Sequence, residues 1–277
     1  MFQGKKIGVA VPAYNEERLV ASVIDSMPSY VDRVYIVDDG STDRTRQIVL
    51  NMCQKNSKVE LVEHEANRGV GAAIITGYEK CLQDGMDIAV VMAGDNQMDP
   101  AELPKLLAPV INGEAGYCKG NRMASLKTMR GMPPLRRFGN WLLKWVTRVS
   151  SGNYQIADPQ NGYAAVSSEA LQRIKLDDLY PYYGYCNHLL AKFTVAGVRA
   201  VEVPIPARYQ GEKSKIRYSK YIRKVGWLLL NNFAWRMEMK WASFTSRRTA
   251  AHRAQPAAGI RQITQALEFL PGASRRR

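Results

Sequence analysis

Residues 88–97 read Ile-Ala-Val-Val-Met-Ala-Gly-Asp-Asn-Gln, and this stretch decides the fold class. Its apolar run, from Ile88 to Met92, predicts a buried parallel strand. The carboxylate of Asp95 and the amide of Gln97 follow at the strand end, where ligands of open α/β sheets bind. Oxygen atoms placed there can hold a hard divalent cation, which in turn can hold a diphosphate. Because glycine, aspartate and asparagine also favour turns, a plain turn is the alternative.

Outward from this stretch, the first half of the chain alternates between strand and helix patterns. Strict alternation predicts a mostly parallel sheet that helices cover on both faces. The predicted strands are residues 7–11, 34–37, 59–62 and 88–92. Four helices are predicted: one that starts at Asn15, one that follows a cap at Thr42, and two at residues 70–82 and 100–110. Beyond Lys119 the pattern loosens, and it predicts helices at 135–149, 169–174, 187–195 and 218–241, a strand ending at Val166 and an extended segment at 201–206.

Three of the predicted strands end in polar side chains. The first is followed by Pro12-Ala-Tyr-Asn-Glu16, the second by Asp38-Asp-Gly-Ser-Thr-Asp43, and the fourth by Gly94-Asp95. Since the carboxyl ends of parallel strands meet at one edge of a sheet, these three ends outline a site. The adjacent carboxylates of Asp38 and Asp39 repel each other, so we expect a cation, a base edge or a ribose beside them.

Two common nucleotide-binding patterns are absent from the sequence. A dinucleotide site needs G-x-G-x-x-G after the first strand, and this chain has no glycine there. The segment Gly69-Val-Gly71 follows the third strand and lacks the third glycine, and no Walker A sequence occurs. We therefore expect neither NAD binding nor P-loop ATPase activity.

Size and composition set the broad class. At 277 residues and 31.1 kDa, the chain has room for one large α/β domain with appendages. Its four cysteines are widely spaced and form no C-x-x-C pair, and the N-terminus has no signal-peptide pattern, which together favour a reduced, cytoplasmic protein. The net charge of +14 suits an anionic partner, either nucleic acid, an anionic lipid surface or a phosphorylated substrate, and a solvated basic face is the alternative.

Four motifs stand in order along the chain: Val9 to Glu17 (VAVPAYNEE), Val37 to Asp43 (VDDGSTD), Asn67 to Gly69 (NRG) and Gly94 to Gln97 (GDNQ). Together they resemble family-2 glycosyltransferases, and within that family the dolichol- and polyprenyl-phosphate sugar synthases such as dolichyl-phosphate mannosyltransferase. The resemblance covers roughly residues 6–240. It implies the GT-A fold, a Rossmann-like, mostly parallel α/β sheet flanked by helices. It also implies a nucleotide-diphosphate sugar as donor and Mg²⁺ or Mn²⁺ as cofactor.

The resemblance further implies roles for individual residues. The residues expected at the nucleotide are Pro12, Tyr14, Glu16, Asp38, Asp39 and Arg68, with Asp39 on the base or ribose. Asp95 and Gln97 are the expected metal ligands. Arg122, in Gly120-Asn-Arg122, and Arg137 are expected to bind phosphate of the acceptor or donor, which suits the forked guanidinium. Asp95, Arg122 and Arg137 are thereby the expected catalytic residues. The residues expected over the donor diphosphate are Arg208, Lys213 and Lys215. For any single arginine, a surface ion pair is the alternative.

The sequence departs from the family pattern at two places. Ala93 stands where the Asp-x-Asp motif has its first carboxylate, so either metal binding is weaker or Asp95 suffices together with diphosphate and water. The segment Tyr185-Cys-Asn-His188 lacks the acidic residue with which many inverting relatives deprotonate a hydroxyl acceptor. A hydroxyl needs a general base, whereas a phosphate monoester is already anionic near neutral pH. The missing carboxylate therefore favours a lipid-phosphate acceptor. His188 is the alternative base, although a lone histidine is more often structural.

These features predict an enzyme that moves a hexose, with inversion, from a UDP- or GDP-sugar to a polyprenyl or dolichyl phosphate, as in cell-envelope glycan biosynthesis. Residues 1–211 would form the catalytic domain, residues 212–245 a basic amphipathic, membrane-proximal helical segment, and residues 246–277 a disordered basic tail. The apolar core of the helical segment, residues 226–235, is too short to span a bilayer. The enzyme would therefore bind the cytoplasmic membrane face peripherally, alone or with a membrane-protein partner.

Two alternatives stay open at this point. A transferase of the same fold could use a hydroxyl acceptor in a polysaccharide or glycolipid, with an acidic base contributed from elsewhere in the chain. A catalytically silent basic scaffold could instead bind a nucleotide or a polyanion. No nucleic-acid-binding motif occurs and the aromatic residues do not interleave with the basic run, so no nucleic-acid partner is expected.

Overall fold

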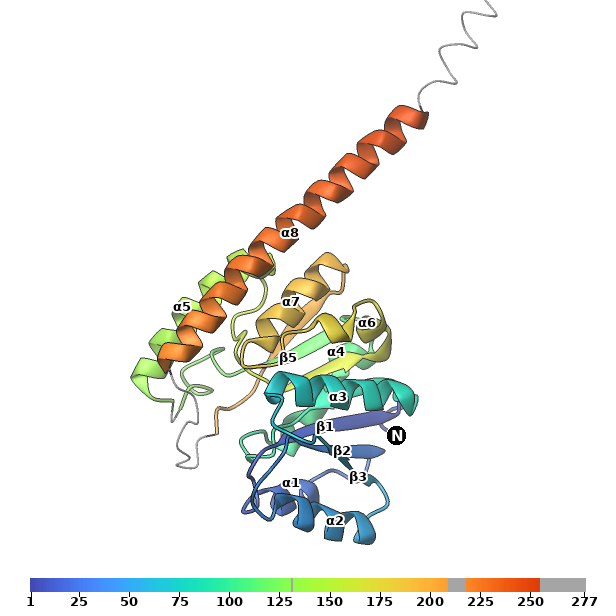
Figure 1. Cartoon of the computed structure of the whole chain (residues 1–277), viewed down its shortest axis with the longest axis vertical. Helices are drawn as coiled ribbons and strands as arrows, with labels where there is room; N and C mark the ends of the chain where they lie inside the picture. Colours follow the sequence, from blue (N-terminus) through green and yellow to red (C-terminus); the bar gives the residue numbers. More distant parts are fainter. Residues whose placement is uncertain (131, 209–217, 255–277) are drawn as a thin grey trace, which may run out of the picture. The chain divides into compact units, whose positions relative to one another are not determined.

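The computed structural model describes residues 1–130, 132–208 and 218–254 (Figure 1). One compact unit spans Met1–Phe233, and Ala234–Arg277 make up a second. In the described ranges, the second unit consists of the end of helix α8, which spans Tyr218–Ala254 and includes the helix predicted at 218–241. The predicted division at residue 211 falls outside the described residues, as does most of the predicted tail, so the division into three parts stays a prediction.

A mostly parallel sheet forms the centre of the first unit, as the alternating pattern predicts. In the described residues it has seven strands in the order β3-β2-β1-β4-β6-β5-β7, and β6 runs antiparallel to its neighbours β4 and β5. The strands are β1 (Ile7–Ala13), β2 (Arg33–Asp38), β3 (Val59–Glu63), β4 (Ile88–Val91), β5 (Tyr117–Asn121), β6 (Ala164–Ser167) and β7 (Ala200–Pro204).

Helices cover both faces of this sheet because successive strand residues point to opposite sides. Val9 and Val90 lie in a core that also contains residues of α1, α2 and α4. Tyr35 and Ala89 lie in a second core with residues of α3, α6 and α7. The helices are α1 (Val20–Asp25), α2 (Thr45–Lys55), α3 (Val70–Gln83), α4 (Leu103–Ile111), α5 (Pro134–Ser151), α6 (Ser168–Gln172) and α7 (Tyr185–Val195), with short 3₁₀ helices η1 (Pro100–Glu102) and η2 (Leu176–Asp178).

Two predicted helix starts are wrong, and both lie at the polar strand ends. Helix α1 begins at Val20 rather than at Asn15, whose φ of 54° is incompatible with a right-handed helix. Helix α2 begins at Thr45 rather than directly after a cap at Thr42. The intervening residues bind the neighbouring loop instead of entering a helix, because their polar groups find partners there.

Strand β5 has no counterpart in the sequence prediction. It reads Tyr-Cys-Lys-Gly-Asn, and the charge of Lys119 conceals the apolar pattern of a buried strand. Lys119 is nevertheless fully buried. Its ammonium group donates a hydrogen bond to the carbonyl oxygen of Asn161, which is how a cation is accommodated there.

The strand order changes direction at β1. The chain proceeds from β1 to β2 and β3 on one side, and then crosses to β4 on the other side. Such a reversal of direction is where open α/β sheets bind ligands. Among the described residues, no helix offers a stretch of apolar sequence long enough to cross a membrane.

Candidate active site

Backbone and side-chain hydrogen bonds fasten the loop after β1 to the loop after β2. The backbone N–H of Asn15 donates to Ser41 Oγ at 2.9 Å, and the N–H of Thr42 donates to Asn15 Oδ1 at 2.8 Å. The N–H of Glu16 donates to Thr45 Oγ1 at 2.8 Å. The structure thus brings the first two polar strand ends together, and with them the predicted nucleotide residues Pro12, Tyr14, Glu16, Asp38 and Asp39.

Asp39 fastens a third loop to this pair. Its buried carboxylate accepts hydrogen bonds from the backbone N–H groups of Arg68 and Gly69, each at 2.8 Å, and lies 2.7 Å from His64 Nδ1. The other ring nitrogen of His64 lies 3.0 Å from Thr76 Oγ1. The predicted residues Asp39 and Arg68 therefore meet through the Arg68 backbone, while the Arg68 side chain is exposed.

Neighbouring N–H donors explain how two adjacent carboxylates can be buried side by side. Asp38 accepts a hydrogen bond from the backbone N–H of Ser41 at 3.1 Å, in addition to the donors around Asp39. Such donors replace the water that a buried carboxylate loses. These donors come from the chain itself, and the cation, base edge or ribose expected beside the two carboxylates stays a prediction. The sequence did not predict His64 as a site residue, because no sequence pattern around it indicates a contact with Asp39, 25 positions earlier.

The turn after β4 lies against the end of β1. The backbone N–H of Gly94 donates to the carbonyl oxygen of Pro12 at 3.3 Å, and a Cβ at position 94 would lie 3.7 Å from Glu16 Cγ. Asp95 Oδ1 accepts a hydrogen bond from the Gln97 N–H at 3.1 Å. The predicted metal ligands therefore share one turn, beside the predicted nucleotide residues.

The donor set of this turn fits a cation that is shared with a ligand. Within the described ranges, no three His, Cys, Asp or Glu side chains are arranged to hold a metal ion. Asp95 and Gln97 supply oxygen atoms, the donor type that Mg²⁺ and Mn²⁺ prefer, and Mg²⁺ commonly takes one or two carboxylates together with phosphate and water. A cation held by these two side chains would need further oxygens from a diphosphate or water.

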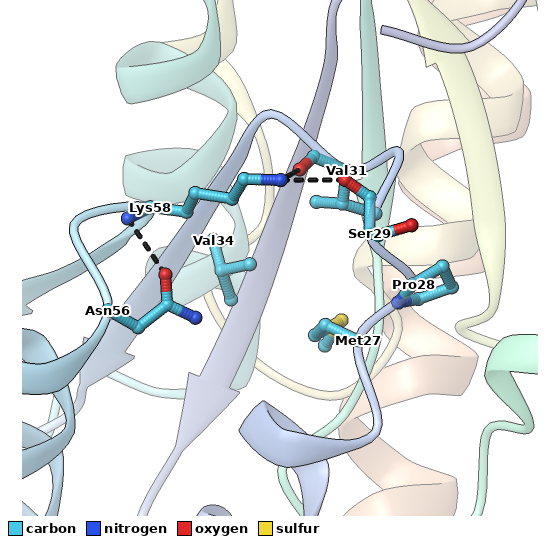
Figure 2. A pocket seen from close by; sticks show the side chains of 7 residues that line it. All are labelled: Met27, Pro28, Ser29, Val31, Val34, Asn56 and Lys58. Carbon is cyan, nitrogen blue, oxygen red and sulfur yellow. Dashed lines mark hydrogen bonds between the residues drawn. The ribbon is translucent and has the colours of Figure 1, made fainter.

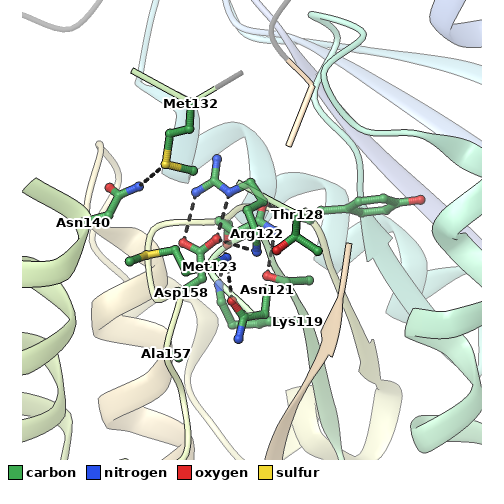
Figure 3. Close-up of polar contacts among 12 residues, drawn as sticks. Lys119, Asn121, Arg122, Met123, Thr128, Met132, Asn140, Ala157 and Asp158 are labelled. Carbon is green, nitrogen blue, oxygen red and sulfur yellow. Dashed lines mark hydrogen bonds and ion pairs between the residues drawn. The ribbon is translucent and has the colours of Figure 1, made fainter. Parts of the chain in front are cut away.

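Arg122 forms a bidentate ion pair with Asp158, a residue that the sequence did not single out (Figure 3). The Nε atom donates to Asp158 Oδ2 at 2.8 Å and Nη2 donates to Oδ1 at 3.0 Å. Asp158 is fully buried. Burial alone would raise the pKa of this carboxyl, but the charge and hydrogen bonds of Arg122 outweigh burial and hold the pKa below its ordinary value.

Glu202 on β7 holds the backbone that carries Asp158. Its carboxylate accepts hydrogen bonds from the N–H groups of Ala157 at 2.8 Å and Asp158 at 2.7 Å, and from Asn121 Nδ2 at 2.9 Å. Burial raises the pKa of Glu202, against the effect of these hydrogen bonds. The network fixes the loop before β6 against β5 and β7, and thereby sets the position of the Arg122 partner.

Arg122 and Arg137 lie in or contact the loop that follows β5, and the backbone leading to Arg208 contacts it as well. Arg122 begins this loop, and Arg137 donates from Nε to the Met132 carbonyl at 3.0 Å and from Nη2 to the Met129 carbonyl at 3.2 Å. The residue before Arg208 donates its backbone N–H to the Thr128 carbonyl at 2.9 Å.

Arg208 also reaches the N-cap of η1, four residues after Asp95. Its Nη2 lies 3.0 Å from Asp99 Oδ2, and the other oxygen of Asp99 accepts from the Ala101 N–H at 3.0 Å. Residues 207 and 208 thus connect the start of η1, which follows the Asp95 turn, with the loop after β5. Lys213 and Lys215, predicted to continue this basic segment, lie outside the described residues.

His188 has a structural role. Its Nδ1 accepts a hydrogen bond from the Tyr180 N–H at 3.1 Å. Burial, assisted by the charge of Lys192, lowers the His188 pKa to about 4. The ring is therefore a weak base and its acceptor nitrogen is occupied, so it is poorly suited to the general-base role considered for it.

A small hollow lies at the opposite end of β2 (Figure 2). Its volume is about 160 Å³, and Val34 at the start of β2 forms part of its lining. The Lys58 ammonium beside it donates to the carbonyls of Ser29 at 2.6 Å and Val31 at 2.9 Å. Because ligands of such sheets bind at the carboxyl ends of the strands, this hollow is separate from the candidate site.

Comparison with known proteins identifies the sequence family and its relatives. The sequence model described as "Glycosyl transferase family 2" matches residues 8–175. UDP-N-acetylglucosamine–dolichyl-phosphate N-acetylglucosaminyltransferase of Methanococcus voltae is 33% identical over 218 residues, covering 74% of this chain and 86% of that protein. Polyprenol monophosphomannose synthase of Mycolicibacterium smegmatis is 29% identical over 202 residues, covering 71% and 75%.

Solved structures with a similar fold include glucosyl-3-phosphoglycerate synthase from Mycobacterium tuberculosis in complex with Mn²⁺ and UDP-glucose. The TM-score is 0.64 with 24% sequence identity, covering 83% of this chain and 80% of that one. At this identity the likeness concerns the fold, which is the predicted GT-A-like arrangement.

Proposed function

This chain belongs to glycosyl transferase family 2 and is a glycosyltransferase, and on that premise we propose that it transfers a hexose from a nucleotide-diphosphate sugar to a polyprenyl or dolichyl phosphate. The Methanococcus voltae relative is named for UDP-N-acetylglucosamine and dolichyl phosphate, and the Mycolicibacterium smegmatis relative is named for the synthesis of polyprenol monophosphomannose. These names support a lipid-phosphate acceptor and make UDP-N-acetylglucosamine the first donor to test.

The observation that carries the proposed acceptor is the position of Arg122 and Arg137 at the loop after β5, which begins with Arg122 and whose carbonyls accept hydrogen bonds from Arg137. Forked guanidinium groups suit phosphate oxygens. An acceptor that arrives as a phosphate needs cations and no general base, because it is already ionised near neutral pH. The occupied, weakly basic ring of His188 and the Arg122-bound carboxylate of Asp158 support the same choice.

The loops after β1, β2 and β3 would hold the donor nucleotide, through Pro12, Tyr14, Glu16, Asp38, Asp39 and Arg68. Asp95 and Gln97 would hold Mg²⁺ or Mn²⁺, which when bound neutralises charge on the diphosphate. Arg208 would approach the diphosphate from the segment beside the Asp95 turn. Arg122, aligned by Asp158, and Arg137 would orient the acceptor phosphate.

In the proposed reaction, an oxygen of the acceptor phosphate attacks the anomeric carbon of the sugar. The new carbon–oxygen bond forms as the bond to the nucleoside diphosphate breaks on the opposite side, so the anomeric configuration inverts. The nucleoside diphosphate leaves with the bonding electron pair. The side chains named above bind and orient the reactants, and none of them has to remove a proton.

The proposed enzyme works at the cytoplasmic face of the membrane as a peripheral protein. The lipid acceptor lies in that membrane, and the positive net charge of +14 favours an anionic surface. A membrane-protein partner is compatible with this arrangement.

A donor panel tests the proposal. Purified protein, Mg²⁺ or Mn²⁺ and a short polyprenyl phosphate are incubated with radiolabelled UDP- and GDP-sugars, and label is followed into an organic-extractable, mild-acid-labile product. We expect a labelled lipid from one donor, beginning with UDP-N-acetylglucosamine. Label transferred only to hydroxyl acceptors would replace the proposal with the hydroxyl-acceptor alternative, and failure to bind or consume any donor would favour the silent scaffold.

A further inference from the structure

Helix α5 is amphipathic, and its apolar side faces solvent. The stripe repeats at helical spacing, with Phe138 62% and Trp141 51% exposed. We call the following residues the α5 apolar stripe: Phe138, Trp141, Leu142, Trp145, Val146 and Val149, all of them exposed. A helix that packs on a protein core normally buries such a stripe.

The side of α5 that faces the protein is polar instead. Thr147 and Ser151 are 2% and 1% exposed. Thr147 Oγ1 donates to Asn187 Oδ1 on α7 at 3.3 Å, and Ser150 Oγ donates to the Leu229 carbonyl on α8 at 2.7 Å. Hydrogen bonds therefore fix the rotation of α5 with its apolar side outward, which leaves that side available for an apolar partner.

Helix α8 continues the exposed apolar surface within the first unit. Val225 and Leu229 pack inward, whereas Trp227 and Leu230 are exposed. Figure 1 shows α5 running beside this part of α8. A mostly apolar hollow of about 330 Å³ lies between the two helices, lined by residues that include Trp145 and Leu230. Such a hollow gives a hydrocarbon chain a place to enter.

The charges around this surface are of one sign. Lys144 Nζ and the guanidinium carbon of Arg148 lie 5.5 and 5.2 Å from the centre of the Trp145 ring. Neither residues 134–151 nor residues 218–233 contain an aspartate or glutamate. Apolar and tryptophan side chains with lysine and arginine at their edge are typical of helices that lie at a membrane interface. A twofold pairing of two copies would bring identical cations together, which disfavours a dimer through this face.

We propose that the α5 apolar stripe and the exposed apolar residues of α8 up to Phe233 form one docking surface for an anionic lipid bilayer, with α5 in the plane of the interface. The inference rests on the proposed function in one respect, since a lipid-linked acceptor is what takes the enzyme to a membrane. Arg137 lies one helical turn before Trp141. Docking would therefore hold this predicted phosphate-binding arginine near the level of the lipid phosphates.

Vesicle binding without any sugar donor tests the surface directly. Sedimentation is measured with phosphatidylcholine vesicles that contain or lack phosphatidylglycerol. We expect binding to the anionic vesicles, weakened about tenfold or more by the double substitution Leu142→Ser and Val146→Ser, because both side chains are exposed and would enter the bilayer. A charge test compares two double variants of equal net charge. The first carries Lys144→Gln and Arg148→Gln, and the matched control carries Lys5→Gln and Lys55→Gln. Only the first pair should weaken binding.

Tryptophan emission reports on the same surface, because all five tryptophans lie on α5 and α8. Replacing Trp227, Trp235 and Trp241 with Phe leaves the two reporters on α5. Their emission should shift to the blue on anionic vesicles and be quenched by brominated lipid. Unchanged emission at saturating lipid would overturn the proposal, as would undiminished vesicle binding of the double serine variant. A native protein that is a dimer in solution, with a double serine variant that is a monomer, would also overturn it. Vesicle binding with no sugar transfer would count only against the proposed function.

Discussion

The guanidinium of Arg122 forms a bidentate ion pair with the fully buried carboxylate of Asp158, 36 residues away in the sequence. Nε and Nη2 donate to the two carboxylate oxygens at 2.8 and 3.0 Å. A third hydrogen bond runs from the Arg122 backbone N–H to the same carboxylate at 3.0 Å. Glu202 holds the backbone of Asp158 in turn. The orientation of a predicted phosphate-binding arginine is therefore set by two carboxylates beneath it.

Asp158→Asn tests this alignment. The substitution removes a charged acceptor from Arg122, a loss of about 2 kcal/mol. We therefore expect kcat/KM for the lipid phosphate to fall about thirtyfold. The KM for the nucleotide sugar should stay within about twofold, because the donor is bound elsewhere. Steady-state kinetics with each substrate varied separately measures both values.

Glu63→Gln serves as the matched control for Asp158→Asn. It breaks the exposed ion pair with Arg46, which solvent screens, so stability should be nearly unchanged. If both substitutions change acceptor kinetics alike, or if Asp158→Asn raises the two KM values equally, Asp158 does not position Arg122 for the acceptor.

Ala93→Asp should strengthen metal binding by restoring the first carboxylate of the Asp-x-Asp pattern. We expect the Mn²⁺ dissociation constant in the presence of UDP to fall about tenfold, equivalent to about 1.4 kcal/mol. Electron paramagnetic resonance of free Mn²⁺ measures this without catalysis. Ala93→Asn adds an oxygen without charge and should have a smaller effect. Equal Mn²⁺ affinity in all three proteins would remove the Asp95 turn as the metal site.

Asp39→Asn should weaken both the fold and nucleotide binding. The Arg68 and Gly69 N–H groups bond to different oxygens of Asp39, and asparagine keeps one oxygen, so one donor would lose its acceptor at a cost of about 2 kcal/mol in the free energy of unfolding. UDP binding, measured by calorimetry, should weaken about tenfold. Asp38→Asn should destabilise less, because Asp38 accepts from the single backbone N–H of Ser41. The reverse order of stabilities would contradict the role assigned to the buried Asp39.

His188→Asn separates a structural from a catalytic histidine through pH. The His188 pKa is lowered to about 4 in the fold from an ordinary value of 6.5, so between these values the unfolded chain binds more protons. Stability in the native protein should therefore fall as pH is lowered through this window, by up to about 3 kcal/mol. Asn keeps an acceptor for the Tyr180 N–H and does not titrate, so the variant should have a flatter profile. Denaturant unfolding from pH 7 to pH 4 measures it.

Activity of the same variant at neutral pH completes the test. The structural role predicts turnover within about threefold of the native enzyme, because no proton passes through the ring. A loss of several orders of magnitude in kcat, with stability intact, would restore His188 as a general base and with it the hydroxyl-acceptor alternative.

The sequence predicted the sheet well because its strands are short apolar runs with polar ends. Residues 88–92 carry enough signal to place a strand and the turn beside it. The contacts that shape the site join residues far apart in the sequence, and no local pattern contains them. Asp39 with His64 and Arg122 with Asp158 are such pairs.

Two further misses have local causes. Lys119 conceals strand β5, because a buried cation satisfied by a carbonyl looks like a surface residue in the sequence. The spacing of residues 135–149 predicted a helix correctly, but periodicity cannot tell which side of a helix faces the protein. The hydrogen bonds of Thr147 and Ser150 decide that, and they turn the apolar side of α5 outward.

The central claim is that the acceptor is a lipid phosphate, and one comparison tests it most directly. The preferred nucleotide sugar is offered with a short polyprenyl phosphate or with the matching polyprenol, and the extracted lipid is weighed by mass spectrometry. The account predicts one added sugar residue, with the mass of the sugar in the preferred donor, on the polyprenyl phosphate and no product from the alcohol. Transfer to the alcohol at a comparable rate, or donor consumption with the phosphate left unmodified, would contradict it.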